Sequence, residues 1–355
     1  MIDRFLEANF TSVHMLCSII SRFTEPGEPL NEYIDEHLAK YGRIVGADES
    51  KVNRLRIGDI SIRDLTFLLF EEQQRNPSEE KVQNSSTFIN SVVSKLRGSF
   101  LVLDSVTGLT DAFFIDRRRY CLFRDAGLLE NIIFGPVYTI NRLRSSIPFI
   151  ETCSEQGDIG IGTGFVVSTG ETSDAERRFI VTNRHVLEGQ SVEKIATFDN
   201  EFRTSCESIL CDYADLAAIE VECDVPVQSL LIATDDALLT GIIALGYPKV
   251  ARSIEPVLLA HSGEVNGIVK TVDGSELLAI SCHVNPGNSG GPIIDSIGMC
   301  CGVVAQSQSL VFENPSVAGS QVSATYNMAI PGTIVNRFIA ESCGSPMRVQ
   351  PGVLC

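Results

Sequence analysis

The sequence predicts a mostly α-helical N-terminal module followed by a mainly β domain, with the change near residue 146. Over the first hundred residues, apolar side chains recur at spacings of three or four, as they do along a helix that buries one face. After residue 146, short apolar or alternating runs recur at turn-like intervals and are separated by Gly, Asp, Asn, Ser and Pro. This second pattern is typical of antiparallel strands in a sandwich or barrel.

The N-terminal module is predicted to contain four helices, each bounded by a capping or helix-breaking residue. They cover residues 2–23, residues 30–41, a segment opened by a capping box at Ser61 and Asp64, and residues 77–98. Between residues 99 and 145 the pattern is mixed. Two short strands, SFLVLDSV and DAFFID, precede a helical segment that ends at Gly135. The residues suggest no specific role for this region.

Charge is distributed unevenly along the 355 residues, whose formal net charge is −17. Residues 1–145 hold 18 Lys and Arg against 20 Asp and Glu, whereas residues 146–355 hold 10 against 25. The acidic second part should repel phosphate backbones, so no nucleic-acid partner is expected. No run of 18 apolar residues exists, so no membrane association is expected either.

The eleven cysteines predict free thiols in a reducing compartment. Their number is odd, they do not cluster at the spacing of zinc ligands, and the N-terminus lacks the features of a secretion signal. A cytoplasmic location is therefore expected. We expect no metal and no cofactor.

The stretch HVNPGNSGGP, residues 283–292, places one hydroxyl between pairs of glycines. Such a serine is either part of a tight turn or a nucleophile held on one. A nucleophilic Ser289 needs a base, and the chain has only five histidines, at 14, 37, 185, 261 and 283. His185 is the best candidate, because FIVTNRHVLEG reads as a strand that runs into a turn. His283 could approach Ser289 but is only six residues away.

Asp215, at the head of the apolar strand DLAAIEV, is the preferred carboxylate to orient that base, with Asp212 as its competitor. Chain order separates the possible scaffolds. No histidine follows residue 289, which excludes the order of catalytic residues found in α/β-hydrolases. The β-rich sequence after Ser289 argues against a subtilisin-like domain. The order His185, Asp215, Ser289 is that of chymotrypsin.

Six motifs in family order resemble a trypsin-like serine protease, closest to the HtrA/Deg type. They are GTGFVVS (162–168), TNRHV (182–186), DLAAI (215–219), ALGYP (244–248), NPGNSGGP (285–292) and MAIPGTIVNRFI (328–339). The resemblance implies a protease domain over 146–342 with two antiparallel six-stranded β-barrels, at about 146–225 and 232–330. A C-terminal helix at 331–341 and a tail at 343–355 would follow, with no PDZ module.

The resemblance also implies roles for the residues around Ser289. Gly287 and Ser289 would supply the N–H groups of an oxyanion hole, and Asn288 would shape that turn. A substrate pocket would be lined by His283, Val284 and Asn285 on one side and by Ala305, Gln306 and Ser307 on the other. No acidic residue stands among these six, so small or medium apolar side chains are the expected preference.

Asn288 occupies the position at which digestive-type relatives carry an aspartate that pairs with a new N-terminus. Because Asn288 is uncharged, we expect activity without N-terminal processing.

The function predicted from these features is that of a serine endopeptidase acting on polypeptides through a Ser-His-Asp triad. The alternative is a catalytically silent scaffold of the same fold whose helical module mediates protein–protein interaction. In either case residues 1–145 are candidates for binding a partner or for self-assembly.

Overall fold

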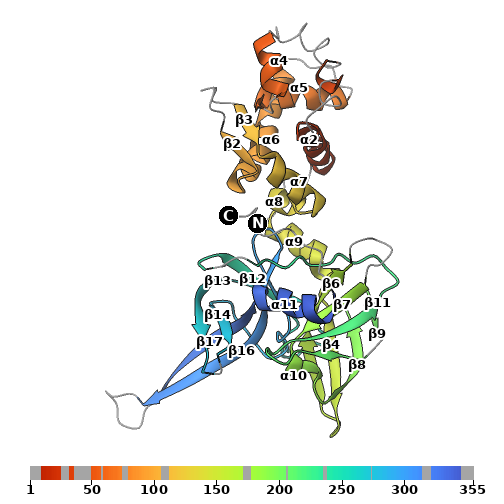
Figure 1. The fold of residues 1–355 in the computed structure, drawn as a ribbon, viewed down its shortest axis with the longest axis vertical. Helices are drawn as coiled ribbons and strands as arrows, with labels where there is room; N and C mark the ends of the chain where they lie inside the picture. The colour runs from red at the N-terminus through yellow and green to blue at the C-terminus, as the bar shows by residue number, and fades with distance from the viewer. Residues whose placement is uncertain are drawn as a thin grey trace. The chain divides into compact units, whose positions relative to one another are not determined.

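The computed structural model describes residues 9–24, 32–35, 49–56, 59–73, 79–104, 112–170, 177–204, 207–234, 238–272, 274–313 and 321–344. The chain divides into two compact units. The first comprises Met1–Tyr138 with Gly352–Cys355, and the second comprises Thr139–Pro351 (Figure 1). Helix α9, Pro136–Leu143, spans the boundary between them.

The first unit is mostly helical, as predicted. Its helices are α2 (Phe10–Arg22), α4 (Glu49–Arg56), α5 (Ile62–Glu72), α6 (Glu79–Gly98), α7 (Arg117–Asp125) and α8 (Leu129–Phe134). A small antiparallel sheet of order β1-β3-β2 is formed by Asp59–Ser61, Ala112–Ile115 and Val102–Asp104. The predicted helix at 30–41 is seen over residues 32–35, and its remainder lies outside the described residues.

The capping box predicted before α5 is present. The Ser61 backbone N–H and hydroxyl both donate to Asp64 Oδ2, at 3.0 and 2.7 Å. In return, the Asp64 N–H donates to the Ser61 hydroxyl at 3.1 Å. This reciprocal pair satisfies N–H groups that the first turn of a helix leaves open, and it fixes where α5 begins.

The first half of the second unit contains two antiparallel sheets. One has the order β5-β4-β8 and consists of Ile159–Thr163, Phe149–Ser154 and Gln190–Ala196. The other has the order β10-β11-β7-β6, with β9 also pairing with β11. Its strands are Ile209–Leu210, Ala217–Glu222, Arg177–Thr182, Phe165–Thr169 and, for β9, Arg203–Thr204. The closure of these strands into a barrel stays a prediction.

The second half forms a closed six-stranded antiparallel barrel of order β12-β13-β14-β17-β16-β15 (Figure 1). Its strands are Gly241–Gly246, Leu259–Lys270, Glu276–Ile280, Gln321–Pro331, Cys300–Glu313 and Pro292–Ile294. Small and branched apolar side chains fill the interior, among them Val265, Ile293 and Ala329, each fully buried. Barrels of this size have an interior that side chains can fill.

A shared core joins the two halves. Phe165 and Phe179 from the first half pack in one cluster with Val303 of the barrel and with Phe338 of the C-terminal helix α11 (Gly332–Ser342). The helix predicted at 331–341 is present as α11, with Pro331 as its N-cap. Because both halves bury side chains in this cluster, loops that leave them at one end are held in fixed relation to each other.

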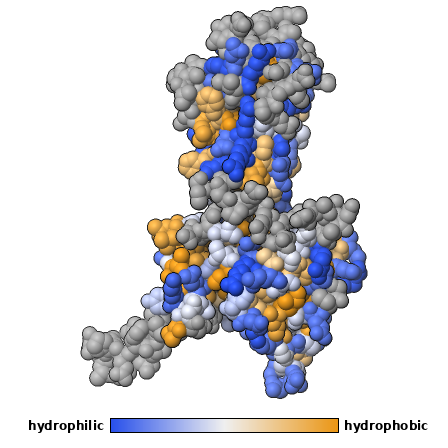
Figure 2. All heavy atoms as spheres, viewed as in Figure 1, coloured by the Kyte–Doolittle hydropathy of each residue, from blue (hydrophilic) through white to orange (hydrophobic). Residues whose placement is uncertain are grey.

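The cysteines that the structure describes are all free, in agreement with the prediction; Cys206 and Cys355 lie outside the described residues. Within the described ranges, no helix combines the length and apolar character needed to cross a membrane. On the face shown in Figure 2, patches of apolar residues lie among hydrophilic ones on both units.

Asp295, in the turn between β15 and β16, provides a test of the barrel's electrostatics. Its Oδ1 accepts the N–H groups of Ile297 and Met299 at 3.0 and 2.9 Å. Burial raises the pKa of Asp295 to about 6, although these backbone hydrogen bonds act in the opposite direction. An acid whose pKa is higher in the folded state stabilises the fold below its unfolded pKa. That contribution is lost as the pH rises to the folded value.

We therefore expect Asp295→Asn, which keeps the accepting oxygen and removes the charge, to be the more stable form at pH 7 by about 3 kcal/mol. The difference should vanish near pH 4. Urea unfolding between pH 4 and pH 7 measures it, with Asp295→Ala as the variant that also loses the acceptor. A difference that does not change with pH would contradict this account.

Candidate active site

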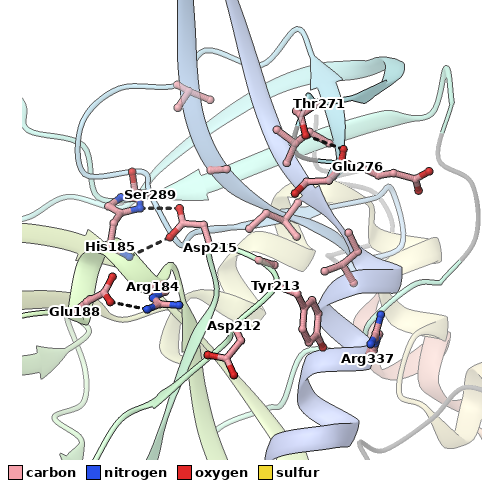
Figure 3. A pocket seen from close by; sticks show the side chains of 18 of the residues that line it. Arg184, His185, Glu188, Asp212, Tyr213, Asp215, Thr271, Glu276, Ser289 and Arg337 are labelled. Carbon is pink, nitrogen blue, oxygen red and sulfur yellow. Dashed lines mark hydrogen bonds and ion pairs between the residues drawn. The ribbon is translucent and has the colours of Figure 1, made fainter.

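A groove of about 1490 Å³ lies in the second unit and is lined by segments from both of its halves (Figure 3). The short helix α10 (Arg184–Leu187) and the loop before β11 contribute from the first half. The barrel contributes the β13–β14 turn, the loop before β15 and parts of β16 and β17, and α11 contributes Ile334 and Arg337. His185, Asp215 and Ser289 all line this groove.

The sheet register explains why His185 and Asp215 meet. Strands β7 and β11 are antiparallel neighbours, and Thr182 at the end of β7 pairs with Ala217 at the start of β11. The residues that follow β7 and those that precede β11 therefore leave the same edge of the sheet. The side-chain amide of Asn183 donates to the Asp215 carbonyl at 2.8 Å and fastens the two loops together.

His185 holds both oxygens of the Asp215 carboxylate. Its ring Nδ1 lies 2.7 Å from Oδ2, and its backbone N–H donates to Oδ1 at 3.0 Å (Figure 3). With Nδ1 facing the carboxylate, the proton of a neutral ring is held on Nδ1, and Nε2 is left as the acceptor. The competitor, Asp212, lines the groove but has no hydrogen bond to the ring among the described residues.

The charge of Asp215 is maintained by its partner. Burial on its own would raise the pKa of this carboxyl. The hydrogen bonds from the His185 side chain and backbone, together with the attraction of the ring, lower the pKa below its ordinary value. Asp215 is therefore ionised at neutral pH and acts as a fixed negative charge beside the imidazole.

Ser289 lies beside the ring of His185 in Figure 3, on the loop that leads into β15. In the part of the chain that the structure describes, no hydrogen bond joins its hydroxyl to the imidazole. A loose nucleophile–base contact is common without a bound ligand and tightens when a substrate arrives. The groove thus contains a hydroxyl, an imidazole and a carboxylate, of which the last two are hydrogen-bonded to each other.

The loop before Ser289 presents unpaired backbone donors. Gly287 is buried and has φ of +104°, a conformation that favours glycine. A Cβ at this position would collide with the carbonyl oxygen of Tyr247. Within the described ranges, the N–H groups of Gly287 and Ser289 donate to no protein acceptor, whereas the N–H of Gly290 donates to Val304 O at 3.0 Å. Buried N–H groups without partners are rare and indicate a place where a ligand oxygen fits.

Thr163, which the sequence analysis did not single out, organises this loop. It is fully buried at the end of β5, and its hydroxyl donates to Gly287 O at 2.6 Å and accepts the Tyr247 N–H at 2.9 Å. Its own N–H donates to Ser289 O at 2.9 Å. The only sequence signal for this role is the position of Thr163 between two glycines in GTGFVVS.

The predicted pocket residues are brought together in part. Val284, Asn285 and Ala305 line the groove. His283 is not among the lining residues, and its ring lies 5.9 Å from that of His261. The side chains of Gln306 and Ser307 lie outside those that the structure describes.

Asn288, the predicted oxyanion neighbour, is buried, and its Oδ1 has no hydrogen-bond partner among the residues that the structure describes. The apolar walls that the sequence did not predict come from Leu277, Ile330 and Ile334.

A polar cluster fixes the loop that carries Asp215. The Tyr213 hydroxyl donates to Glu341 Oε2 at 2.9 Å, and the guanidinium of Arg337 lies 4.5 Å from the centre of the Tyr213 ring. Arg337 also pairs with Glu341 at 2.9 Å. The cluster ties a position two residues before Asp215 to helix α11, and so it limits the movement of the carboxylate.

The described residues contain no group of three or more His, Cys, Asp or Glu side chains that could hold a metal ion.

Comparison with known proteins finds similarity to serine proteases. Residues 162–303 match the model of the trypsin-like peptidase domain. A probable periplasmic serine endoprotease, DegP-like, of Chlamydia trachomatis is 28% identical over 189 residues, which cover 53% of this chain and 34% of that protein. The serine protease Do-like HtrA of Bacillus subtilis is 27% identical over 163 residues, which cover 42% of this chain and 34% of that protein. The chain thus spans about a third of the length of these relatives.

Among solved structures, the active form of the Rv3671c protease of M. tuberculosis aligns with a TM-score of 0.43 at 21% identity. The alignment covers 60% of this chain and 86% of that one.

Thr163→Val tests the role of the buried hydroxyl, because valine keeps the shape and removes both hydrogen bonds. The change leaves the Tyr247 N–H and the Gly287 carbonyl unsatisfied. We therefore expect the free energy of unfolding to fall by about 2 to 4 kcal/mol. Thr163→Ser, which keeps the hydroxyl and loses one methyl group, should cost only about 1 kcal/mol. Denaturant unfolding distinguishes the two variants, and equal stability would show that the hydroxyl contributes little.

Proposed function

We propose that this chain, which carries a trypsin-like protease domain of the HtrA type, is a serine endopeptidase that cleaves polypeptides. The observation that carries the proposal is the two-point hold of His185 on Asp215 in the groove that Ser289 also lines. An imidazole fixed in this way has one free nitrogen, which suits it to take a proton from a neighbouring hydroxyl.

The proposed reaction is acyl transfer in two steps. His185 Nε2 takes the proton of Ser289 Oγ as that oxygen attacks the carbonyl carbon of the scissile peptide bond. The protonated ring then gives this proton to the leaving amine, and the acyl group stays on Ser289. In the second step water attacks the acyl carbon, His185 takes its proton, and Ser289 Oγ leaves and is reprotonated.

The N–H groups of Gly287 and Ser289 are proposed to bind the oxyanion in both steps. They are unpaired on the described part of the chain, so no bond has to break before a substrate oxygen is bound. Each such donor is worth about 2.7 to 4 kcal/mol of transition-state stabilisation in related chemistry. Asp215 remains charged and stabilises the imidazolium that forms in each step.

The pocket for the substrate side chain before the scissile bond is proposed to lie between Val284, Asn285 and Ala305, with Ile330 as an apolar neighbour. No acidic side chain stands among these four residues. Small and medium apolar substrate side chains are the proposed preference.

We also propose that the first half of the domain closes as a second six-stranded barrel. Its two sheets share one core, in which Ile150 and Ile195 of one sheet pack with Val166, Ile180 and Ile219 of the other. The proposed protease domain covers 146–342, with 1–145 as a separate module and 343–355 as a tail. The module is proposed to bind a partner or a second copy, and the location is proposed to be cytoplasmic.

A serine-reactive phosphonate should label the intact chain, and it should fail to label Ser289→Ala.

Asp215→Asn is expected to lower kcat by roughly 10⁴-fold, because the ring loses its orienting charge. Asp212→Asn, which changes a carboxylate of the same loop, is the matched control and should retain most activity. Labelling is read by intact mass and turnover by cleavage of an unfolded polypeptide. A chain that is never labelled would favour the silent scaffold.

Activity should not require cleavage near residue 146. The buried side chain at 288 is an uncharged amide, so it offers no carboxylate to pair with a newly formed N-terminal amine. Phosphonate labelling of the purified full chain, with its N-terminus verified by mass, is the measurement. An inert full chain that becomes reactive only after trimming near residue 146 would contradict the prediction.

A further inference from the structure

A second cavity of about 380 Å³ lies in the Thr139–Pro351 unit and shares no lining residue with the groove. Its volume is within the range of sites that hold a small ligand or a large side chain. The apolar lining comes from four separate segments of the chain: Ile140, Phe198, Tyr247, Pro256, Val257 and Leu258. None of these residues has a part in the proposed reaction.

The rim of this cavity exposes apolar surface. Phe198 is 87% exposed, and Val257 is 44% exposed. An aromatic ring held in water beside an apolar cavity is unfavourable unless something covers it. The surface therefore fits an apolar side chain that enters the cavity and packs against Phe198.

The charge around the cavity selects the kind of occupant. Arg144 and Asp199 line it and pair with each other at 3.2 Å. Glu255 also lines it, and among the described residues its carboxylate forms no ion pair or hydrogen bond. An occupant with a cation next to its apolar group would complement this carboxylate.

Tyr247 connects the cavity with the loop of the groove. Its side chain lines the cavity and contacts the Phe149 ring edge-to-face at 5.5 Å, while its backbone N–H donates to Thr163. Its carbonyl oxygen is the atom that leaves no room for a Cβ at Gly287. Two residues later, the Lys249 N–H donates to Pro286 O at 3.1 Å. A shift of this segment is therefore transmitted directly to residues 286–289.

We propose that this cavity binds an aromatic side chain of a polypeptide segment that carries a neighbouring Lys or Arg, and that binding stabilises the oxyanion loop through Tyr247. The second half of this statement rests on the proposed function, since it concerns the loop before Ser289. The binding half is independent of it.

The chain contains no tryptophan, so the indole fluorescence of a peptide is seen against no tryptophan background. The probe is the acetylated and amidated tetrapeptide Gly-Lys-Trp-Gly, titrated with the full-length Ser289→Ala protein, which is expected not to cleave it. We expect saturable binding with half-saturation below about 1 mM. Val257→Arg, which fills the entrance and repels the lysine, should weaken binding at least about tenfold.

Ile254→Arg is the matched control, because Ile254 is fully exposed in the same loop and does not line the cavity. It should bind as the parent does, and thermal unfolding verifies that both variants are folded. The peptide Gly-Glu-Trp-Gly should bind more weakly to the parent, and Glu255→Gln should remove this preference. Binding that is absent, or that is equal in Val257→Arg and Ile254→Arg, would overturn the site.

Amide hydrogen exchange of residues 285–291 in the Ser289→Ala protein measures whether binding in the cavity stabilises the oxyanion loop. The peptide should slow this exchange by at least about fivefold, and it should have no effect in Val257→Arg. Binding without any change in exchange would overturn the link. Phosphonate labelling of the unmodified Ser289 is recorded in parallel. A complete lack of labelling would count against the protease proposal. The peptide titration and the hydrogen exchange would still decide the proposal for the cavity.

Discussion

The hydrogen bonds of Thr163 hold the first half of the second unit to the loop that carries Ser289. One buried threonine uses its hydroxyl and its backbone N–H to bind residues 247, 287 and 289, which all belong to the barrel half. The restraint matters because a buried loop with unpaired N–H groups would otherwise gain free energy by turning them toward a protein acceptor. Thr163 fixes the carbonyl groups of the loop on one side, and within the described ranges the N–H groups of Gly287 and Ser289 donate to no protein acceptor. Donors that are oriented in advance cost no reorganisation when charge develops.

The second constraint is the antiparallel register of β7 and β11, which sets His185 against Asp215 before any ligand is present. The carboxylate is only partly shielded, with 38% of its side chain exposed, so burial alone does not decide its state. Two hydrogen bonds from one residue keep it ionised, and the cluster of Tyr213, Arg337 and Glu341 holds its loop from the other side. Orientation here comes from the sheet and from α11 more than from depth of burial.

The sequence was informative where chemistry and spacing are local. The capping box at Ser61, the helix after Pro331 and the strand runs after residue 146 each depend on near neighbours, and each is found as predicted. The scarcity of histidine made the choice of His185 possible, and the structure brings this residue to the groove that Ser289 lines.

Other features depend on contacts between distant segments. Thr163 acts on residues 84 and 124 positions away, and Tyr213 reaches a carboxylate 128 positions away. No local pattern encodes such pairs. His283 is a similar case, because the ring near it belongs to His261 on β13, 22 positions earlier in the sequence.

Two buried thiols on β16, Cys300 in the shared core and Cys301 in the barrel interior, have a chemical consequence of their own. Cys300 and Cys301 are adjacent and fully or almost fully buried, and burial raises the pKa of Cys300 to about 12 and that of Cys301 well above its ordinary value. A thiol that stays protonated is a poor nucleophile and a poor target for oxidants. These two thiols are buried and each donates a hydrogen bond to a backbone carbonyl, Cys300 to Gly302 O and Cys301 to Ile293 O, so their role is packing and not redox chemistry. The shared core and the barrel interior should therefore keep the same packing whether the surroundings are oxidising or reducing.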